Sequence, residues 1–301
     1  MKARKKISTG FLVTLLMAFT CVSPRLFAMA EDKINNAKIE ELTGAKGKWN
    51  EKEGVFKVSV PRSDLNIMAA GIKLPPSMGL TAWAAFKNME GHTMVMGDIV
   101  LLEDQVNPAM DAALENGLEV TALHNHFFWD SPKLMFMHVG GMGDSEKLAQ
   151  AIGKVFEKLH QQGKTNHLAA PNSQERSIHA DKLDAILKAT GETNQGVYKW
   201  TFGRTITMSG MEFGNAMGVN TWAAFLGTDD NARVAGDFAM LEDELQSVLK
   251  ALRKARINVV AIHNHMTKES PRMMFLHYWG EGKAEDLARG VRSGLDCLSS
   301  R

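Results

Sequence analysis

Apolar and polar residues alternate in two segments far apart in the chain, and this alternation predicts strands. Residues 54–60 and 196–202 both begin at a glycine and carry the alternating pattern. Each follows a segment whose apolar residues recur at helical spacing, within 33–42 and 183–187. The same opening, a short helix followed by a half-buried strand, therefore occurs twice in the chain.

The residues after each opening predict further strands and helices in a matching order. Strands are expected at 82–86, 93–102, 118–123 and 131–138, with counterparts of the first two at 221–225 and 233–241. Helical stripes begin at Val106 and at its counterpart Leu245, and a longer helix is expected to cover 148–159. Asn107 and Pro108 are suited to the cap and first turn of a helix. Glycines at 140, 141 and 143 are expected to turn the chain from strand to helix.

The two copies are related by a constant offset. His124 and His263 are 139 residues apart (263 − 124), and the same offset relates Trp83 to Trp222 and Asp98 to Asp237. A period of this length is too long for a solenoid and indicates a duplicated domain-sized unit. We predict a mixed α+β fold of two tandem units related by a pseudo-twofold axis. The expected boundaries are a first repeat over 31–160, a linker over 161–176 and a second repeat over 177–301.

The first thirty residues have the pattern of a signal peptide. Lysines and an arginine precede a short apolar run at 11–19, and Ala28-Met29-Ala30 offers small residues for cleavage. The run is shorter than the roughly 20 residues that span a bilayer. We therefore expect a periplasmic or secreted protein without a membrane span. Lipidation at Cys21 is the alternative. Cleavage after residue 30 leaves Cys297 as the one remaining cysteine, so no internal disulfide is expected.

Charge excludes one class of partner. The formal net charge is +1 and no basic stripe with interleaved aromatic residues is present. Nucleic acid is therefore not expected as a partner. Nothing in the sequence indicates the oligomeric state.

Histidines at equivalent positions of the two repeats predict metal sites. His124 and His126 are two residues apart on a strand and face the same side, and His138 follows on the next strand. The second repeat offers His263, His265 and His277, so six of the ten histidines occupy these positions. Neutral imidazole is a common ligand of zinc. We predict two trios, one in each half, that bind a divalent cation, zinc first, with manganese, iron, nickel and copper as alternatives. A paired acid–base site without metal and purely structural histidines are the competing hypotheses.

Carboxylates near the histidines supply further candidates. Asp130 and Glu269 each lie four residues after the second histidine and are candidate fourth ligands. Glu103 and Glu242 end equivalent strands, where each either acts as a general acid–base or caps the following helix. Arg62 and Arg204 follow another pair of strands, where each either clamps a substrate carboxylate or phosphate or is exposed. The two tryptophans of the repeat are interpreted as core residues.

These motifs resemble a known family. The paired His-Asn-His, Ser-Pro and His-x-x-Gly elements, with the Trp-Ala-Ala-Phe strands and the Gly-Asp pairs, are similar to the LppY/LpqO family of exported bacterial proteins. That resemblance implies export and duplication over nearly the whole mature chain, and it carries no established activity. The spacing from His124 to His138 is also similar to the metal triad of acetolactate decarboxylases. His124, His126 and Asp130 resemble the first cupin motif.

Two functions follow as expectations. The first is a metal-dependent hydrolase or lyase that acts on a small or cell-envelope substrate. The alternative is a non-catalytic periplasmic module that binds a metal or another ligand. The sequence leaves open whether the protein is an enzyme.

Overall fold

The fold is described here from a computed structural model that covers residues 34–160 and 177–299. The described residues belong to one compact unit, which contains both repeats. The predicted signal peptide and the predicted linker lie outside the described residues. Within 34–160 and 177–299, no helix combines the length and the apolar character that crossing a membrane requires.

Each repeat forms a six-stranded antiparallel sheet, and the two sheets have the same strand order. The first has the order β1-β2-β5-β6-β9-β7 and the second β10-β11-β14-β15-β17-β16. In the first sheet these strands are β1 (Gly47–Asn50), β2 (Val55–Pro61), β5 (Thr81–Met89), β6 (His92–Leu102), β9 (Leu134–Gly143) and β7 (Glu119–His124). In the second they are β10 (Glu192–Asn194), β11 (Val197–Gly203), β14 (Asn220–Gly227), β15 (Ala232–Leu241), β17 (Met273–Gly282) and β16 (Asn258–His263). The predicted duplication and the mixed α+β class are confirmed.

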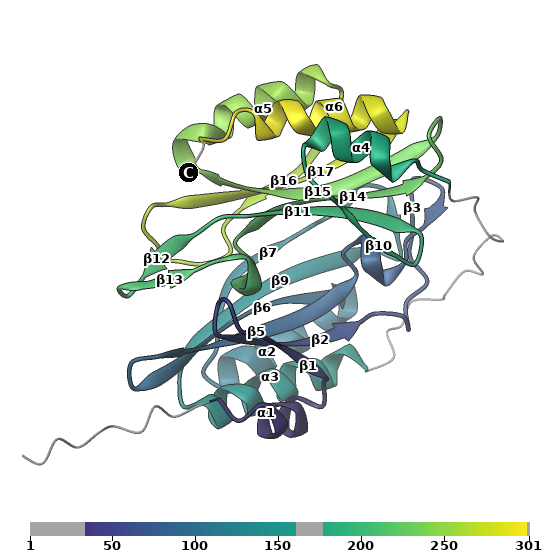
Figure 1. Cartoon of the computed structure of the whole chain (residues 1–301). Coiled ribbons are helices and arrows are strands. Elements are labelled where there is room, and N and C mark those ends of the chain that lie inside the picture. The colour runs from purple at the N-terminus through teal and green to yellow at the C-terminus, as the bar shows by residue number, and fades with distance from the viewer. Residues whose placement is uncertain (1–33, 161–176, 300–301) are drawn as a thin grey trace, which may run out of the picture. The chain divides into compact units, whose positions relative to one another are not determined.

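Three helices cover the outer face of each sheet. The first sheet carries α1 (Asn36–Thr43), α2 (Val106–Glu115) and α3 (Ser145–Leu159), and the second carries α4 (Ala180–Leu187), α5 (Leu245–Lys254) and α6 (Ala284–Leu295). Figure 1 shows the resulting layers, helices, sheet, sheet and helices, from one side of the unit to the other. The helices hold their places by apolar stripes. On α3, for example, Ile152, Val155 and Leu159 are almost fully buried, and each such side chain contributes about 1.5–3 kcal/mol.

The inner faces of the two sheets pack against each other through a methionine-rich apolar cluster. It combines Met94 and Met96 of the first repeat with Phe213, Met217 and Met273 of the second. Unbranched thioether side chains adapt to an irregular interface, which suits two sheets that are related but not identical. This apolar cluster therefore holds the two inner faces together. The polar residues of the inner faces gather elsewhere between the sheets.

Two local predictions differ from the structure. The glycines after Val139 continue β9 to Gly143 instead of turning the chain, because this stretch pairs with residues 93–96 of β6. The helix α2 begins at Val106 after a 3-10 turn, η2 (Glu103–Gln105), so Asn107 is not its cap. The Gln105 side chain instead accepts a hydrogen bond from the Leu102 amide at 3.0 Å.

The remaining elements are short and lie between the main strands. They are β3 (Met68–Ala69), β4 (Ile72–Lys73), β8 (Asp130–Ser131), β12 (Ile206–Met208), β13 (Met211–Phe213), η1 (Pro76–Met78), η3 (Asn215–Met217) and η4 (Glu242–Glu244).

Candidate metal centre

Strand register places one row of functional side chains on the inner face of each sheet. In the first sheet Trp83 lies opposite Asp98, and Asp98 lies opposite His138. Residues directly opposite one another on neighbouring strands face the same side. The second sheet repeats the row with the residues 139 positions later, Trp222, Asp237 and His277. The two rows belong to the faces that the sheets turn toward each other.

Six histidines meet between these faces and form what we call the histidine cluster: His124, His126, His138, His263, His265 and His277. Each is between 2% and 8% exposed. The close ring pairs join one repeat to the other. The ring centroids are 3.7 Å apart for His124 and His263, 3.6 Å for His126 and His277, and 4.0 Å for His138 and His265.

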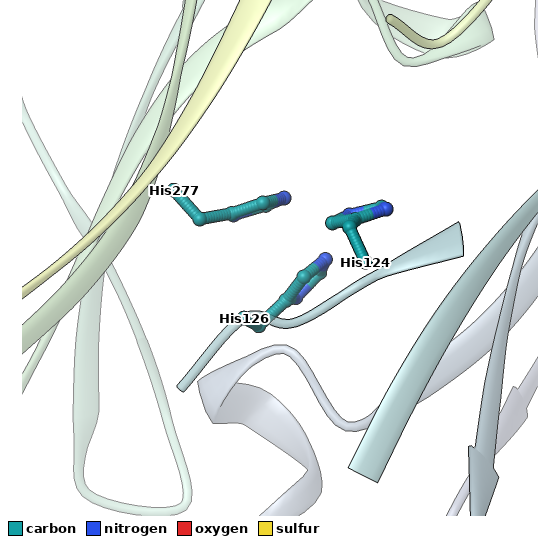
Figure 2. A group of neighbouring side chains, drawn as sticks. All are labelled: His124, His126 and His277. Carbon is teal, nitrogen blue, oxygen red and sulfur yellow. The ribbon is translucent and has the colours of Figure 1, made fainter. Parts of the chain in front are cut away.

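The cluster combines histidines differently from the sequence prediction, which assigned one trio to each half. Among the described residues, three groups bring their ligand atoms within 4.8 Å of one another. They are His124–His126–His277, His124–His138–His263 and Asp237–His263–His265. Figure 2 shows the first group, in which His277 points from the opposite sheet toward the two histidines of the first repeat.

The physical reason lies at the end of β7. That strand ends at His124, so His126 lies in the following loop and is not fixed to the same strand face. The loop carries it to His277, and the symmetric loop carries His265 to His138. The backbone links the repeats at this point as well, because the Thr121 hydroxyl donates to the His265 carbonyl at 2.8 Å.

Most imidazole nitrogens of the cluster are buried without a hydrogen-bond partner. Both ring nitrogens of His124, His126 and His263 have none, nor has Nε2 of His138, His265 and His277. His277 Nδ1 lies 3.2 Å from the Gly236 carbonyl, which fixes a tautomer whose Nε2 carries the free lone pair. A buried polar atom without a partner costs about 1–3 kcal/mol. A bound cation would satisfy several of these nitrogens at once.

Burial keeps the cluster neutral. Desolvation lowers the pKa of every histidine in it, to about 3 for His138 and His277. Neutral imidazole is the form that coordinates a metal, so the ligands are ready at physiological pH without losing a proton.

Two aspartates, Asp98 and Asp237, adjoin the cluster, and we call them the cluster aspartates. Asp98 Oδ2 lies 3.8 Å from His126 Nε2, and Asp237 Oδ2 lies 3.4 Å from His265 Nε2. Burial raises the pKa of Asp98 to about 7 and that of Asp237 well above its ordinary value. A nearby cation favours the ionised carboxylate and would offset that burial cost. Sequence reasoning did not select these residues as ligands, although their shared offset marked them.

A cavity of about 350 Å³ lies against the cluster and is lined by both repeats. Its lining includes His126, His265 and His277 together with the cluster aspartates. Pockets of about this size take small molecules. A ligand in the cavity would therefore lie beside three of the histidines.

Comparison with protein families matches two segments of the chain, 37–158 and 181–297, to one family, described as "Domain of Unknown Function (DUF1259)". Each segment falls within one repeat, and together they cover most of the chain. The chain belongs to this family. A comparison with curated proteins found no match. Among solved structures, a similarity was found to the crystal structure of a trimeric bacterial microcompartment shell protein, PduB. The identity is 11%, the match covers 83% of this chain and 89% of that chain, and the TM-score is 0.21, which is too low to support an argument.

In this DUF1259 protein, Asp130 and Glu269 lie outside the three ligand groups. Asp130 accepts hydrogen bonds from Lys133 Nζ and from the Leu134 amide, each at 2.7 Å. Glu269 accepts one from the Met273 amide at 3.1 Å. Both side chains thus fix the first residue of the strand that carries the third histidine. Their role as metal ligands stays a prediction that these contacts do not support.

Glu103 and Glu242 also lie away from the cluster. Both are exposed and begin the 3-10 turns η2 and η4. Asp98 is four residues before the end of β6 at Leu102 (102 − 98), roughly 13 Å along the strand at about 3.3 Å per residue, and Glu103 comes after that end. This position suits helix capping, and a catalytic role for either residue stays a prediction without support from its location.

The two arginines and the two tryptophans lie in surroundings other than those expected from the sequence. Arg62 and Arg204 are 1% and 7% exposed and bind the protein itself, Arg62 through Asp64 and the Val100 carbonyl and Arg204 through Glu244. They are structural and not available to a substrate. Trp83 and Trp222 are half-buried and line the cavity, so they are not purely core residues.

Proposed function

We propose that this protein is a metal-dependent hydrolase or lyase that acts on a small substrate in the cavity beside the histidine cluster. One observation carries the proposal. His126 and His277 belong to one candidate ligand group and also line the cavity, so a metal held there is accessible to a small molecule. A catalytic site requires such an open position, whereas a structural site closes around its metal.

The donor set supports zinc as the metal. Imidazole nitrogen with an adjacent carboxylate is a combination that zinc accepts, and the partnerless nitrogens are suited to a cation. His124, His126 and His277 would hold one ion, and Asp237, His263 and His265 a second. Zinc supplies Lewis-acid polarisation of a carbonyl or phosphoryl oxygen. The two sheets supply the rest: they bury the histidines to between 2% and 8% exposure and leave the cavity beside them for the substrate.

The compartment is part of the proposal. The leader pattern of residues 1–30 and the resemblance to LppY/LpqO proteins favour export to the periplasm or beyond. A protein in that compartment meets cell-envelope material, which is why the substrate is proposed to be a small molecule or a fragment of the envelope.

A second function, a non-catalytic module that binds metal or ligand, is favoured by one contact. Asp237 lies 3.4 Å from His265 and shares a group with two histidines. With one more ligand from the cluster, four protein donors would close the coordination shell.

The test is metal analysis together with activity on the same sample. Mature protein is stripped with a chelator, reloaded separately with zinc, manganese, iron, nickel or copper, and assayed on panels of esters, amides, lactones and phosphoesters. We expect about one or two equivalents of retained metal and turnover that requires it. His126→Ala should lose the equivalent that His126 holds with His124 and His277, and turnover with it, whereas His92→Ala, at an exposed position, should lose neither metal nor turnover. Retained metal without turnover on any panel supports the binding module. Absence of retained metal contradicts both functions.

A further inference from the structure

Two lysines from different repeats line the same cavity. Lys57 on β2 lies two residues before Ser59, which pairs with Trp83, so the lysine shares the inner face of the first sheet. Lys199 on β11 lies two residues before Thr201, which pairs with Trp222, and it has the same place in the second sheet. Both lysines belong to the cavity lining.

Neither lysine is neutralised by a carboxylate. Among the described residues, neither ammonium forms a hydrogen bond or an ion pair. Each lies instead over an indole ring, Lys57 Nζ at 3.6 Å from the Trp83 centroid and Lys199 Nζ at 4.4 Å from the Trp222 centroid. Cation–π contact holds an ammonium group in place without cancelling its charge.

The two lysines share the cavity with acidic side chains. Burial lowers the pKa of Lys57 to about 8, and the positive charge of Lys199 contributes in the same direction. The nearby acids are the cluster aspartates, with Glu53 near Lys57 and Glu192, which lines the cavity, near Lys199. Two half-buried cations that repel each other across one cavity are stabilised by an anion between them.

A hydroxyl group adds an unused donor. Ser77 lines the cavity, and its Oγ is buried without a hydrogen-bond partner. A ligand oxygen would satisfy it. The indole rings of Trp83 and Trp222 supply flat apolar walls for the remainder of a small ligand.

We propose that Lys57 and Lys199 bind the oxyanion group, a carboxylate or a phosphate, of a small ligand in the cavity beside the histidine cluster. If this ligand is the substrate of the proposed function, the inference rests on that function and gives the substrate a chemical class: a small organic acid or phosphate ester.

The test is calorimetric titration of zinc-loaded mature protein with inorganic phosphate and, separately, with succinate. Lys57→Met and Lys199→Met should each weaken binding about 10-fold, since a hydrogen bond to a charged group contributes about that much. Lys57→Arg keeps the charge and should retain binding within roughly threefold. Lys250→Met removes an exposed lysine from α5 on the outer side of the second sheet, and it should change nothing. Binding of phosphate alone or of succinate alone supports the site and identifies the preferred oxyanion.

Zinc content is measured on each sample, which separates this inference from the proposed function. Protein that keeps its zinc but binds neither anion overturns the lysine site alone. Equal affinity in wild type and both methionine variants does so too, because the anion would then contact the metal or another surface. Equal weakening by Lys250→Met would show a general charge effect and would also overturn the inference. Protein that keeps no zinc contradicts the proposed function, and titration of that metal-free protein then decides the lysine site independently.

Discussion

Replacing His124 by leucine should stabilise the metal-free protein. Both ring nitrogens of His124 are buried without a partner, and its ring stacks on that of His263 at 3.7 Å. Leucine has a similar volume and no polar atom to leave unsatisfied. In most proteins a buried substitution lowers stability, so the predicted sign is unusual and follows only from the unsatisfied nitrogens.

The magnitude follows from two opposing effects. A buried polar group without a partner costs about 1–3 kcal/mol, and His124 has two such atoms. The change of shape costs up to about 1.5 kcal/mol. Two such costs less the change of shape leave a net gain of about 0.5–6 kcal/mol, and each kcal/mol corresponds to roughly 2–4 °C in the unfolding midpoint.

The assay is thermal unfolding followed by circular dichroism, first after chelator treatment and then with added zinc. Metal at 1,000 times its dissociation constant stabilises the wild type by about 4 kcal/mol. His124→Leu should gain much less, because His124 belongs to two of the three ligand groups. The order of stability should therefore reverse when zinc is added. His92→Leu, at an exposed position, should follow the wild type in both conditions.

Two results would refute this reasoning. If metal-free His124→Leu is less stable than the wild type by a similar amount, the imidazole nitrogens are satisfied without a metal. If the variant gains as much from zinc as the wild type, His124 is not a ligand.

Two further predictions concern pH and the buried ion pair of the second repeat. The folded histidine cluster has pKa values far below 6.5, so the unfolded chain takes up protons that the folded protein does not, and metal-free stability falls as the pH falls from 6.5 toward 3. The cluster aspartates act in the opposite direction below pH 7, but two aspartates are outnumbered by six histidines. The free energy of unfolding from urea titration should therefore be lower at pH 5 than at pH 7, by roughly 1 kcal/mol or more per pH unit, and a higher value at pH 5 contradicts this. Glu244→Ala leaves the Arg204 guanidinium buried without its carboxylate and should cost about 3–5 kcal/mol in urea unfolding. Gln105→Ala, at the matching position of the first repeat, should cost only about 1–2 kcal/mol, and equal losses would contradict a charged role for Glu244.

Periodicity predicted most of the long strands and helices and their duplication. The alternation over 54–60 and 196–202 corresponds to β2 and β11, and the helical stripe over 148–159 corresponds to α3. These patterns are local, because the face of a strand or helix is fixed by its own sequence. The constant offset then made the second repeat predictable from the first.

Which residues make up the site depends on contacts between segments that are far apart in the sequence. Alternation tells which side of a strand a histidine faces, but not which other sheet lies opposite. His126 therefore could not be paired with His277 from the sequence, nor His138 with His265. Asp98 could be recognised as a site residue only from the register of β6 with β9, which places it opposite His138. A carboxylate four residues after a histidine, such as Asp130, was near the site in sequence but bound to a backbone amide in space.

Arg204 shows the same limit in another way. An arginine at the end of a strand is usually exposed, but here it is buried because Glu244, from the turn after β15, lies within reach of its guanidinium. The first repeat has a glutamine at this position and uses Asp64 to neutralise Arg62. Arg204 thus pairs with a distant segment, whereas Arg62 pairs with a residue two positions away. The sequence alone does not tell which kind of partner each arginine has.

The central claim is that histidines from both repeats share one metal-binding cluster, and anomalous diffraction at the zinc edge from crystals of zinc-loaded protein tests it most directly. The account predicts a zinc peak at bonding distance, about 2.0–2.1 Å, from His124 and His126 of the first repeat and from His277 of the second. A peak bound only by histidines of a single repeat, or a zinc-loaded crystal with no peak at the cluster, would contradict it.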